Sequence, residues 1–250
     1  LAQTNRQRLD EPTCRAAFHS RHLHGKGTMK PPALVIMAKE PAVGRTKTRL
    51  CPPLTPAQAA ALYEALLRDT IGLAAGLEGL QLAIAVTPPE ALDAFRRWSP
   101  PGVSLLPVRG VDIGDCLNKV LGQLLARGHA QAIALNSDGP TLPTSHLRQA
   151  VADLASADVV LGPGEDGGYY LISLKKPHPD LFRDIDWSTE RVTAQTLARA
   201  EALGLSVVLL PAWYDVDTAS DLERLRAEVA SLPDDAVPYT RHFLDEYLRS

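Results

Sequence analysis

The sequence has few aromatic residues, few cysteines and no long apolar segment. Phe, Trp and Tyr make up only 5% of the 250 residues, so a hydrophobic core must be built mainly from Leu, Val, Ile and Ala. The three cysteines are widely spaced and odd in number, which argues against a disulfide framework or a cysteine-rich zinc site and fits a reducing cytoplasm. No apolar run approaches the roughly 18 residues of a membrane-spanning helix, so we expect no membrane partner.

Basic residues are outnumbered by acidic ones outside the N-terminal segment. The formal net charge is -3 at pH 7, although residues 1–30 hold six lysines and arginines against two acidic residues. The rest of the chain holds 20 basic and 27 acidic residues. Because a surface that binds nucleic acid carries a basic face, this acidic body argues against a nucleic-acid partner.

Residues 1–30 differ from the rest of the chain. They show no hydrophobic periodicity and no apolar core of a signal peptide. We interpret them as a flexible N-terminal extension, with Met29 as a candidate biological start. Residues 31–250 contain no internal repeat and no linker long enough to divide them, and their number suits one α/β domain.

The most informative feature of the sequence is a cation-rich loop that follows an apolar strand. Residues 33–38 form a continuous apolar run, as expected for a strand buried on both faces. The next eleven residues hold four cations against the single acid Glu40, namely Lys39, Arg45, Lys47 and Arg49. Arginine forks and lysine ammonium groups both bind phosphate oxygens, so this charge favours a phosphate site. The alternative is a solvated loop whose cations pair with nearby acids.

The loop departs from the common phosphate-binding motifs. Gly44 is followed by Arg45 rather than Lys, and Lys39 stands where a Walker motif has its first glycine. The three glycines of a dinucleotide fingerprint are missing as well. We therefore expect side chains, in addition to the backbone, to bind the anion.

Strand-like and helix-like segments alternate along the body of the chain. The predicted strands are residues 33–38, 80–86, 103–108, 130–135, 158–161, 169–174 and 205–210. The predicted helices are residues 55–67, 91–98, 112–127, 145–155, 188–203, 218–230 and 240–248. This alternation predicts a single α/β domain in which helices cover both faces of a mostly parallel sheet. Ligands of such sheets bind beyond the carboxyl ends of the strands.

Carboxylates follow two of the predicted strands. Asp138 comes directly after one buried strand, whereas Asp215 and Asp217 lie between another strand and a helix capped by Thr218. Alternating acids can point two carboxylates toward one face. Mg²⁺ and Mn²⁺ prefer oxygen ligands and bind substrate phosphates, so we predict Asp138 and Asp217 as metal ligands. Capping of a turn or a helix is the alternative role for each of them.

A glycine-rich turn lies between two other predicted strands. Asp166-Gly167 between apolar runs is a strong hairpin signal, so a plain turn is one interpretation. In the other interpretation, Gly167 and Gly168 let the backbone approach a ligand, while Glu165 or Asp166 binds hydroxyl groups or metal.

Two shorter polar segments are further candidates. In residues 186–190, Ser188 is a candidate helix cap and Trp187 a candidate apolar platform for a sugar or a base. Residues 109–115 form a polar turn that opens a helix, whose exposed backbone amides can receive an anion.

Several of these segments together resemble one family. The pattern Ala-Lys-x-Pro-x-x-Gly-x-x-Lys-Thr-Arg-Leu covers residues 38–50, and Gly-Pro-x-Glu-Asp-Gly-Gly-Tyr-Tyr covers residues 162–170. Further matches in consistent order are Asp112-Ile-Gly114, Asp138 with Pro140, Trp187-Ser-Thr-Glu190, and Asp215-Val-Asp-Thr218 with Asp221-Leu222. The chain thereby resembles the DUF2064 family of bacterial glycosyltransferase-like proteins. Thr141 departs from the family pattern, which usually has an acid there.

The resemblance implies the GT-A fold of the nucleotide-diphospho-sugar transferase superfamily, a three-layer α/β/α Rossmann-like architecture. It implies a transferase whose partners are a nucleotide-sugar or NTP and a small-molecule acceptor, with Mg²⁺ or Mn²⁺ as cofactor and an oligomer as an open alternative. The predicted catalytic residues are Asp138, Glu165 and Asp166, and the predicted metal ligands are Asp138 and Asp217. The predicted substrate- and phosphate-binding residues are Lys39, Gly44, Arg45, Lys47, Thr48, Arg49, Asp112, Gly167, Gly168, Trp187, Ser188 and Thr189.

Three functional hypotheses are compatible with these residues. The leading one is glycosyl transfer from a nucleotide-diphospho-sugar, which the family resemblance favours. The second is nucleotidyl transfer from an NTP to a phosphorylated small molecule, which the cation loop favours because a triphosphate has more charge to neutralise. The third is a nucleotide-binding module without catalytic activity, which the altered residues near Asp138 suggest.

Overall fold

The computed structural model describes residues 29–97 and 99–249, with side chains up to residue 247. The predicted N-terminal extension lies outside these residues, apart from Met29 and Lys30. The strands are β1 (Ala33–Lys39), β2 (Gln81–Thr87), β3 (Ser104–Pro107), β4 (Ala132–Leu135), β5 (Val159–Pro163), β6 (Tyr169–Leu174) and β7 (Val207–Leu209). The α-helices are α1 (Pro56–Ala75), α2 (Leu92–Arg96), α3 (Ile113–Ala126), α4 (Thr144–Asp153), α5 (Val192–Ala202), α6 (Ala219–Ser231) and α7 (Pro238–Arg249).

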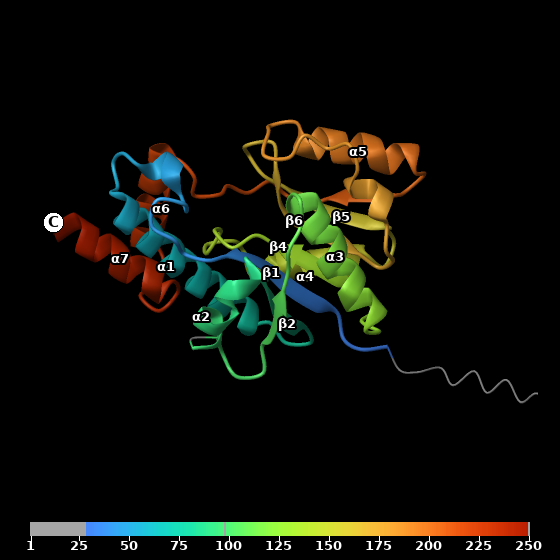
Figure 1. The fold of residues 1–250 in the computed structure, drawn as a ribbon, viewed down its shortest axis with the longest axis horizontal. Coiled ribbons are helices and arrows are strands. Elements are labelled where there is room, and N and C mark those ends of the chain that lie inside the picture. The colour runs from blue at the N-terminus through green and yellow to red at the C-terminus, as the bar shows by residue number, and fades with distance from the viewer. Residues whose placement is uncertain (1–28, 98, 250) are drawn as a thin grey trace, which may run out of the picture.

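The seven strands form one sheet in the order β3-β2-β1-β4-β6-β5-β7 (Figure 1). Strand β6 runs antiparallel to its neighbours β4 and β5, and the other neighbouring strands are parallel. This confirms the predicted mostly parallel sheet. It also confirms the hairpin that Asp166-Gly167 predicts, because β5 and β6 pair directly on either side of that turn.

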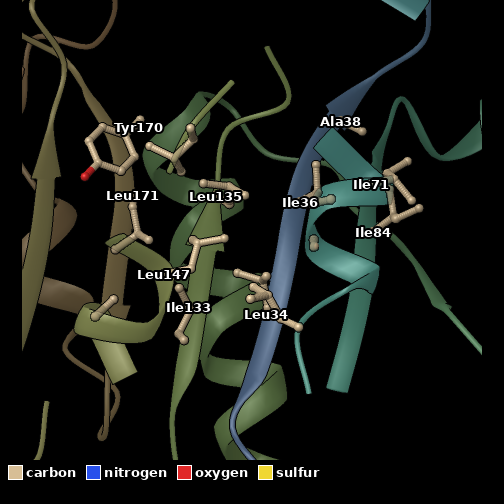
Figure 2. Close-up of a cluster of buried hydrophobic side chains, with 14 of the residues drawn as sticks. Leu34, Ile36, Ala38, Ile71, Ile84, Ile133, Leu135, Leu147, Tyr170 and Leu171 are labelled. Atoms are coloured by element: carbon tan, nitrogen blue, oxygen red, sulfur yellow. The ribbon is translucent and has the colours of Figure 1, made fainter. Parts of the chain in front are cut away.

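Helices cover both faces of the sheet, as predicted. On one face, Leu34 and Ile36 of β1 pack in a cluster that includes residues of α1, α2 and α4. Figure 2 shows these two side chains beside Ile133 and Leu135 of the neighbouring strand β4. On the other face, Val35 belongs to a cluster that includes residues of α3 and α5. Successive β1 side chains are therefore buried on opposite faces, which explains the continuous apolar run in the sequence.

A third apolar cluster lies outside the sheet layers. It is formed by α1, α6 and α7, which Figure 1 shows grouped at one end of the molecule, together with the segment that follows β7. Helix α1 begins as its sequence predicts, because Thr55 and Gln58 form a reciprocal capping box and Pro56 opens the helix. The helix continues to Ala75, eight residues beyond the predicted end, and Asp69 in this additional part accepts hydrogen bonds from the first residues of α7.

The helix predicted over residues 188–203 begins later than expected. Ser188 has a φ of 64°, in the left-handed region, so it cannot be the extended residue that caps a right-handed helix. Helix α5 starts at Val192, and the hydroxyl of Thr189 donates instead to the backbone oxygen of Asp186 at 2.7 Å. The capping role considered for Ser188 is therefore wrong.

Within the described residues, no helix is long and apolar enough to cross a bilayer.

Candidate active site

The candidate site lies at one edge of the sheet, where several strand ends meet. Strands β1 and β4 are parallel neighbours, so the cation loop after β1 and the Asp138 loop after β4 leave the sheet side by side. The turn of the β5–β6 hairpin reaches the same edge, because β6 runs antiparallel to β4. Topology alone thus gathers three of the predicted motifs.

The segment after β7 joins this edge through backbone hydrogen bonds. The Trp213 nitrogen donates to the Pro163 oxygen at 3.1 Å, and the Glu165 nitrogen donates to the Trp213 oxygen at 3.0 Å. Tyr214 and Val216 are buried in the cluster with α1, α6 and α7. Because side chains of an extended segment alternate, the acids between and after these two residues face the other way, toward the strand ends.

Lys47 connects the cation loop to both predicted metal ligands. Its ammonium group donates to Asp138 Oδ2 and to Asp217 Oδ1, the latter at 2.7 Å. The Lys47 side chain is only 6% exposed, compared with 68% for the nearby Arg49. Arg49 Nη1 lies 3.7 Å from the second oxygen of Asp217. The structure therefore brings together four predicted site residues from segments up to 170 residues apart.

Electrostatics keep Lys47 and Asp217 charged. Burial opposes the charge of Lys47, but the adjacent carboxylates of Asp138 and Asp217 outweigh it and raise the pKa of Lys47 above its ordinary value. Burial also favours protonation of Asp217, but the Lys47 ammonium and then Arg49 outweigh it, so the pKa of Asp217 lies below its ordinary value. Lys47 and Asp217 thus stabilise each other's charged forms.

Asp215 has the opposite electrostatic character. Burial first, and the negative charge of Asp138 second, raise its pKa well above the ordinary value. The side-chain amide of Asn136 donates to Asp215 Oδ1 at 2.5 Å. The sequence predicts Asp217 as the metal ligand of the alternating pair, with capping as the alternative for Asp215 and Asp217 alike, and it predicts no role for Asn136. The alternation of acids in residues 213–217 was the available signal for Asp215, whereas nothing in the sequence singled out Asn136.

A buried hydroxyl pair holds the two loops in register. The Tyr63 hydroxyl, from α1, accepts a hydrogen bond from the Lys39 nitrogen at 2.9 Å and lies 2.8 Å from the Ser137 hydroxyl. Burial is the main reason that the pKa of Tyr63 rises to about 12, so the phenol stays protonated at neutral pH. Tyr63 therefore joins the start of the cation loop to the loop that carries Asp138.

A cavity of about 720 Å³ opens beside the ion cluster. Its lining includes the predicted residues Arg49, Asp166, Gly168, Trp187, Ser188, Thr189 and Asp217. Apolar side chains complete the wall, among them Met37, Ile113, Leu117 and Ile172. Trp187 packs closely on Gly114, where an added Cβ would lie 2.3 Å from the indole ring. The cavity thus has a charged end at Arg49 and Asp217, and apolar surface around Trp187.

The hairpin turn separates the two predicted catalytic acids. Asp166 lines the cavity, and its Oδ1 accepts a hydrogen bond from the Gly168 nitrogen at 2.9 Å. Glu165 instead receives two hydrogen bonds from Arg224 of α6, at 2.7 and 3.1 Å. Gly167, with a φ of 88°, has no room for a side chain, because a Cβ would lie 2.1 Å from the Glu190 oxygen. The turn therefore presents Asp166, not Glu165, to the cavity.

The remaining predicted residues lie around the site without joining the ion cluster. The Asp112 side chain caps α3 by accepting from the Asp115 nitrogen at 2.8 Å, so a carboxylate already occupies that helix N-terminus. Arg45 is 3.7 Å from Glu40 and largely exposed. Lys39 and Thr48 are exposed as well, and Gly44 adopts a φ of 74° in the cation loop. Their roles in phosphate binding stay predictions.

Asp138 and Asp217 fit a divalent cation in their chemistry. Their oxygens already converge on a single positive group, the Lys47 ammonium, and hard cations prefer such carboxylate oxygens. In the described part of the chain, no group of three or more His, Cys, Asp or Glu side chains could hold a metal. Two carboxylates suffice for Mg²⁺ where substrate phosphates and water supply its other ligands.

Comparisons with known proteins bear on the family and the fold of the chain. Residues 70–189 match the model of DUF2064, described as an uncharacterized protein conserved in bacteria. The resemblance to that family is confirmed. A crystal structure from Desulfovibrio desulfuricans G20, described as a candidate nucleotide-diphospho-sugar transferase, is 29% identical with a TM-score of 0.80. The match covers 87% of this DUF2064-like chain and 95% of that protein.

More distant structures share the fold alone. CMP:2-keto-3-deoxy-manno-octonic acid synthetase, complexed with CTP, is 16% identical with a TM-score of 0.54, over 80% of this chain and 99% of that one. A 4-diphosphocytidyl-2C-methyl-D-erythritol synthase from Anaerococcus prevotii DSM 20548 is 9% identical with a TM-score of 0.55, over 80% and 96%. The similarity to these structures and to the Desulfovibrio structure confirms the predicted GT-A-like fold. No curated protein sequence matches the chain.

Proposed function

We propose that the chain is a transferase that uses a nucleotide-diphospho-sugar and moves the sugar to a small-molecule acceptor. The observation that carries the proposal is the convergence of Lys47, Asp138, Asp217 and Arg49 beside a cavity that Arg49 and Asp217 line. The 29% identical structure, described as a candidate nucleotide-diphospho-sugar transferase, supports the donor class.

The charged end of the cavity suits the diphosphate. Arg49 is exposed there and offers a guanidinium fork to phosphate oxygens, with Lys39 on the same loop. Asp138 and Asp217 would hold a divalent cation here, which would neutralise negative charge on the diphosphate leaving group. The apolar surface of Trp187, which also lines the cavity, suits the face of a sugar or a base.

Asp166 is the proposed general base. In the transfer, an acceptor hydroxyl oxygen bonds to the anomeric carbon while the bond from that carbon to the diphosphate oxygen breaks. The nucleoside diphosphate leaves with the bonding electron pair, and Asp166 takes the hydroxyl proton. Glu165 is less suited to this step, because both of its carboxylate oxygens already accept hydrogen bonds from Arg224.

Nucleotidyl transfer is the second candidate, and the four cations of the loop favour it. An acceptor phosphate oxygen would then bond to the α-phosphorus of an NTP, and pyrophosphate would leave. The same residues serve this reaction, since its charge also develops on phosphate oxygens. The two reactions differ in the bond that breaks and therefore in the product released.

Product analysis separates the candidates. The protein is incubated with each nucleotide-diphospho-sugar and each NTP, with Mg²⁺ or Mn²⁺, with and without a panel of hydroxylated and phosphorylated acceptors. We expect the protein to release nucleoside diphosphate from one sugar donor when an acceptor is present, and to release it slowly by hydrolysis when water is the only acceptor. The Asp217→Asn variant should release none. Pyrophosphate from an NTP that depends on an acceptor would overturn glycosyl transfer in favour of the second candidate. Tight nucleotide binding without cation dependence or turnover would indicate a binding module.

A further inference from the structure

Lys47 occupies a position that conflicts with the metal site of the proposed function. Its ammonium group contacts one oxygen of Asp138 and one oxygen of Asp217, the two residues proposed to hold a divalent cation. A side chain that satisfies both carboxylates reduces the negative charge available to a second cation. It also adds a positive charge that repels one.

The contact is built into the loop rather than being a chance position of a flexible side chain. Lys47 has a φ of 52° and a ψ of 38°, a left-handed conformation that is uncommon for a residue with a side chain. The preceding residue fixes this turn, because the Thr46 hydroxyl donates to the Glu40 oxygen and accepts from the Ala42 nitrogen at 3.0 Å. The loop therefore aims Lys47 inward, in contrast to the exposed Lys39, Arg45 and Arg49.

We propose that Lys47 competes with the divalent cation for Asp138 and Asp217, so that the cation binds tightly only when a donor phosphate draws the ammonium group away. The proposal rests on the proposed function, because it concerns the same two carboxylates and a phosphate-bearing donor. Phosphate oxygens are strong acceptors for a lysine ammonium group. Lysine has four carbons between its backbone and its charge, so the group can reach a new acceptor while the loop stays in place.

This competition makes phosphate and cation binding cooperative. Phosphate binding frees the two carboxylates, and a cation bound there strengthens phosphate binding by the same factor, since the coupling between two ligands is reciprocal. Without a donor, Lys47 keeps the two acids paired, and the site does not require a cation to remain folded. The cluster thus distinguishes a cation that arrives with a donor from a free cation.

The test measures Mn²⁺ binding to the full-length protein in the absence of nucleotide, from the electron paramagnetic resonance signal of free Mn²⁺. Lys47→Met keeps most of the side-chain length and removes the charge. We expect it to bind Mn²⁺ at least tenfold more tightly than the wild-type protein. The matched control is Lys176→Met, which removes an exposed cation just after the C-terminal end of β6, away from the site, and should change Mn²⁺ affinity less than threefold. Equal affinities of Lys47→Met and wild type would overturn the competition.

A second measurement uses the wild-type protein alone, in case Lys47→Met does not fold. Crystals are soaked in MnCl₂ with and without inorganic pyrophosphate, and anomalous scattering locates Mn²⁺. We expect Mn²⁺ at Asp138 and Asp217 only with pyrophosphate, together with a displaced Lys47. Mn²⁺ in both soaks, with Lys47 unmoved, would overturn the competition and leave the proposed transfer standing. Mn²⁺ in neither soak would overturn the competition and, with it, the cation that the proposed function assigns to these two acids.

Discussion

The carboxylate of Asp69 in α1 accepts a hydrogen bond from the backbone nitrogen of Thr240 in α7 at 2.7 Å, across 171 positions of the sequence. Its other oxygen accepts from the Tyr239 nitrogen at 3.2 Å. The first backbone N–H groups of a helix have no partner within the helix, so Asp69 satisfies two donors that α7 cannot. This contact connects the last helix to the rest of the protein next to the apolar cluster of α1, α6 and α7.

Removal of this contact should destabilise the protein. Asp69 is 5% exposed, and Asp69→Ala leaves the Tyr239 and Thr240 nitrogens without their acceptor. We expect the free energy of unfolding, measured with urea, to fall by about 1–3 kcal/mol. The control is Asp93→Ala, which breaks the exposed ion pair with Arg96 and should change stability by less than about 0.5 kcal/mol. A loss no larger than that of the control would show that α7 docks without Asp69.

The contact of Gly114 with Trp187 predicts a second stability effect. A Cβ on Gly114 would lie 2.3 Å from the Trp187 ring, so Gly114→Ala should push the indole from its place in the cavity wall. We expect a loss of about 1–3 kcal/mol in urea unfolding and weaker binding of any ligand that contacts Trp187. Gly122→Ala, in the same helix α3, meets nothing within 4 Å and should be neutral or gain up to about 1 kcal/mol. Similar results for the two variants would contradict the packing argument.

The two acids of the hairpin turn should differ in catalysis. Asp166→Asn removes the charge, while its remaining side-chain oxygen can still accept from the Gly168 nitrogen, so the turn is retained. We expect kcat to fall by about 10²- to 10⁴-fold, the usual contribution of a general base. Glu165→Gln should lower kcat by less than about tenfold, because Glu165 binds Arg224 of α6 and does not line the cavity. If steady-state kinetics showed a larger loss of kcat for Glu165→Gln than for Asp166→Asn, Glu165 would replace Asp166 as the general base.

His146 should make stability depend on pH below neutrality. Burial lowers its pKa in the folded protein from the ordinary value of 6.5. As pH falls, the unfolded chain binds the proton first, so stability from neutral His146 is complete above pH 6.5 and is lost below it. Between pH 7.5 and pH 5.5, the free energy of unfolding in urea should fall less for His146→Gln than for the wild-type protein. The difference between the two should be at most about 1.4 kcal/mol per pH unit.

His178 contributes in the same direction, because burial also lowers its pKa. His178→Gln should therefore remove another part of the pH dependence of stability. The variant that combines His146→Gln and His178→Gln should show the smallest fall in the free energy of unfolding between pH 7.5 and pH 5.5. Identical pH dependence in wild type and both single variants would rule out burial of these imidazoles as the cause.

Local chemistry allowed most elements to be predicted from the sequence. Thr55, Pro56 and Gln58 determine the start of α1 because they satisfy its first backbone donors without help from other segments. Asp166-Gly167 determines the β5–β6 hairpin because the turn needs a glycine with positive φ. The prediction failed at Ser188, where Trp187 packs on Gly114 and the chain turns before α5 begins. That packing partner is 73 residues away, outside the reach of local patterns.

The sequence by itself determined which residues reach the site edge, because buried parallel strands deliver the loops that follow them to one side of a sheet. Only the tertiary structure decided how those residues pair. It placed Lys47 between Asp138 and Asp217, turned Glu165 toward Arg224, and brought Asp215 into hydrogen-bond contact with Asn136. Charge interactions depend on distances of a few ångströms between segments far apart in the chain, and no spacing along the sequence specifies such distances.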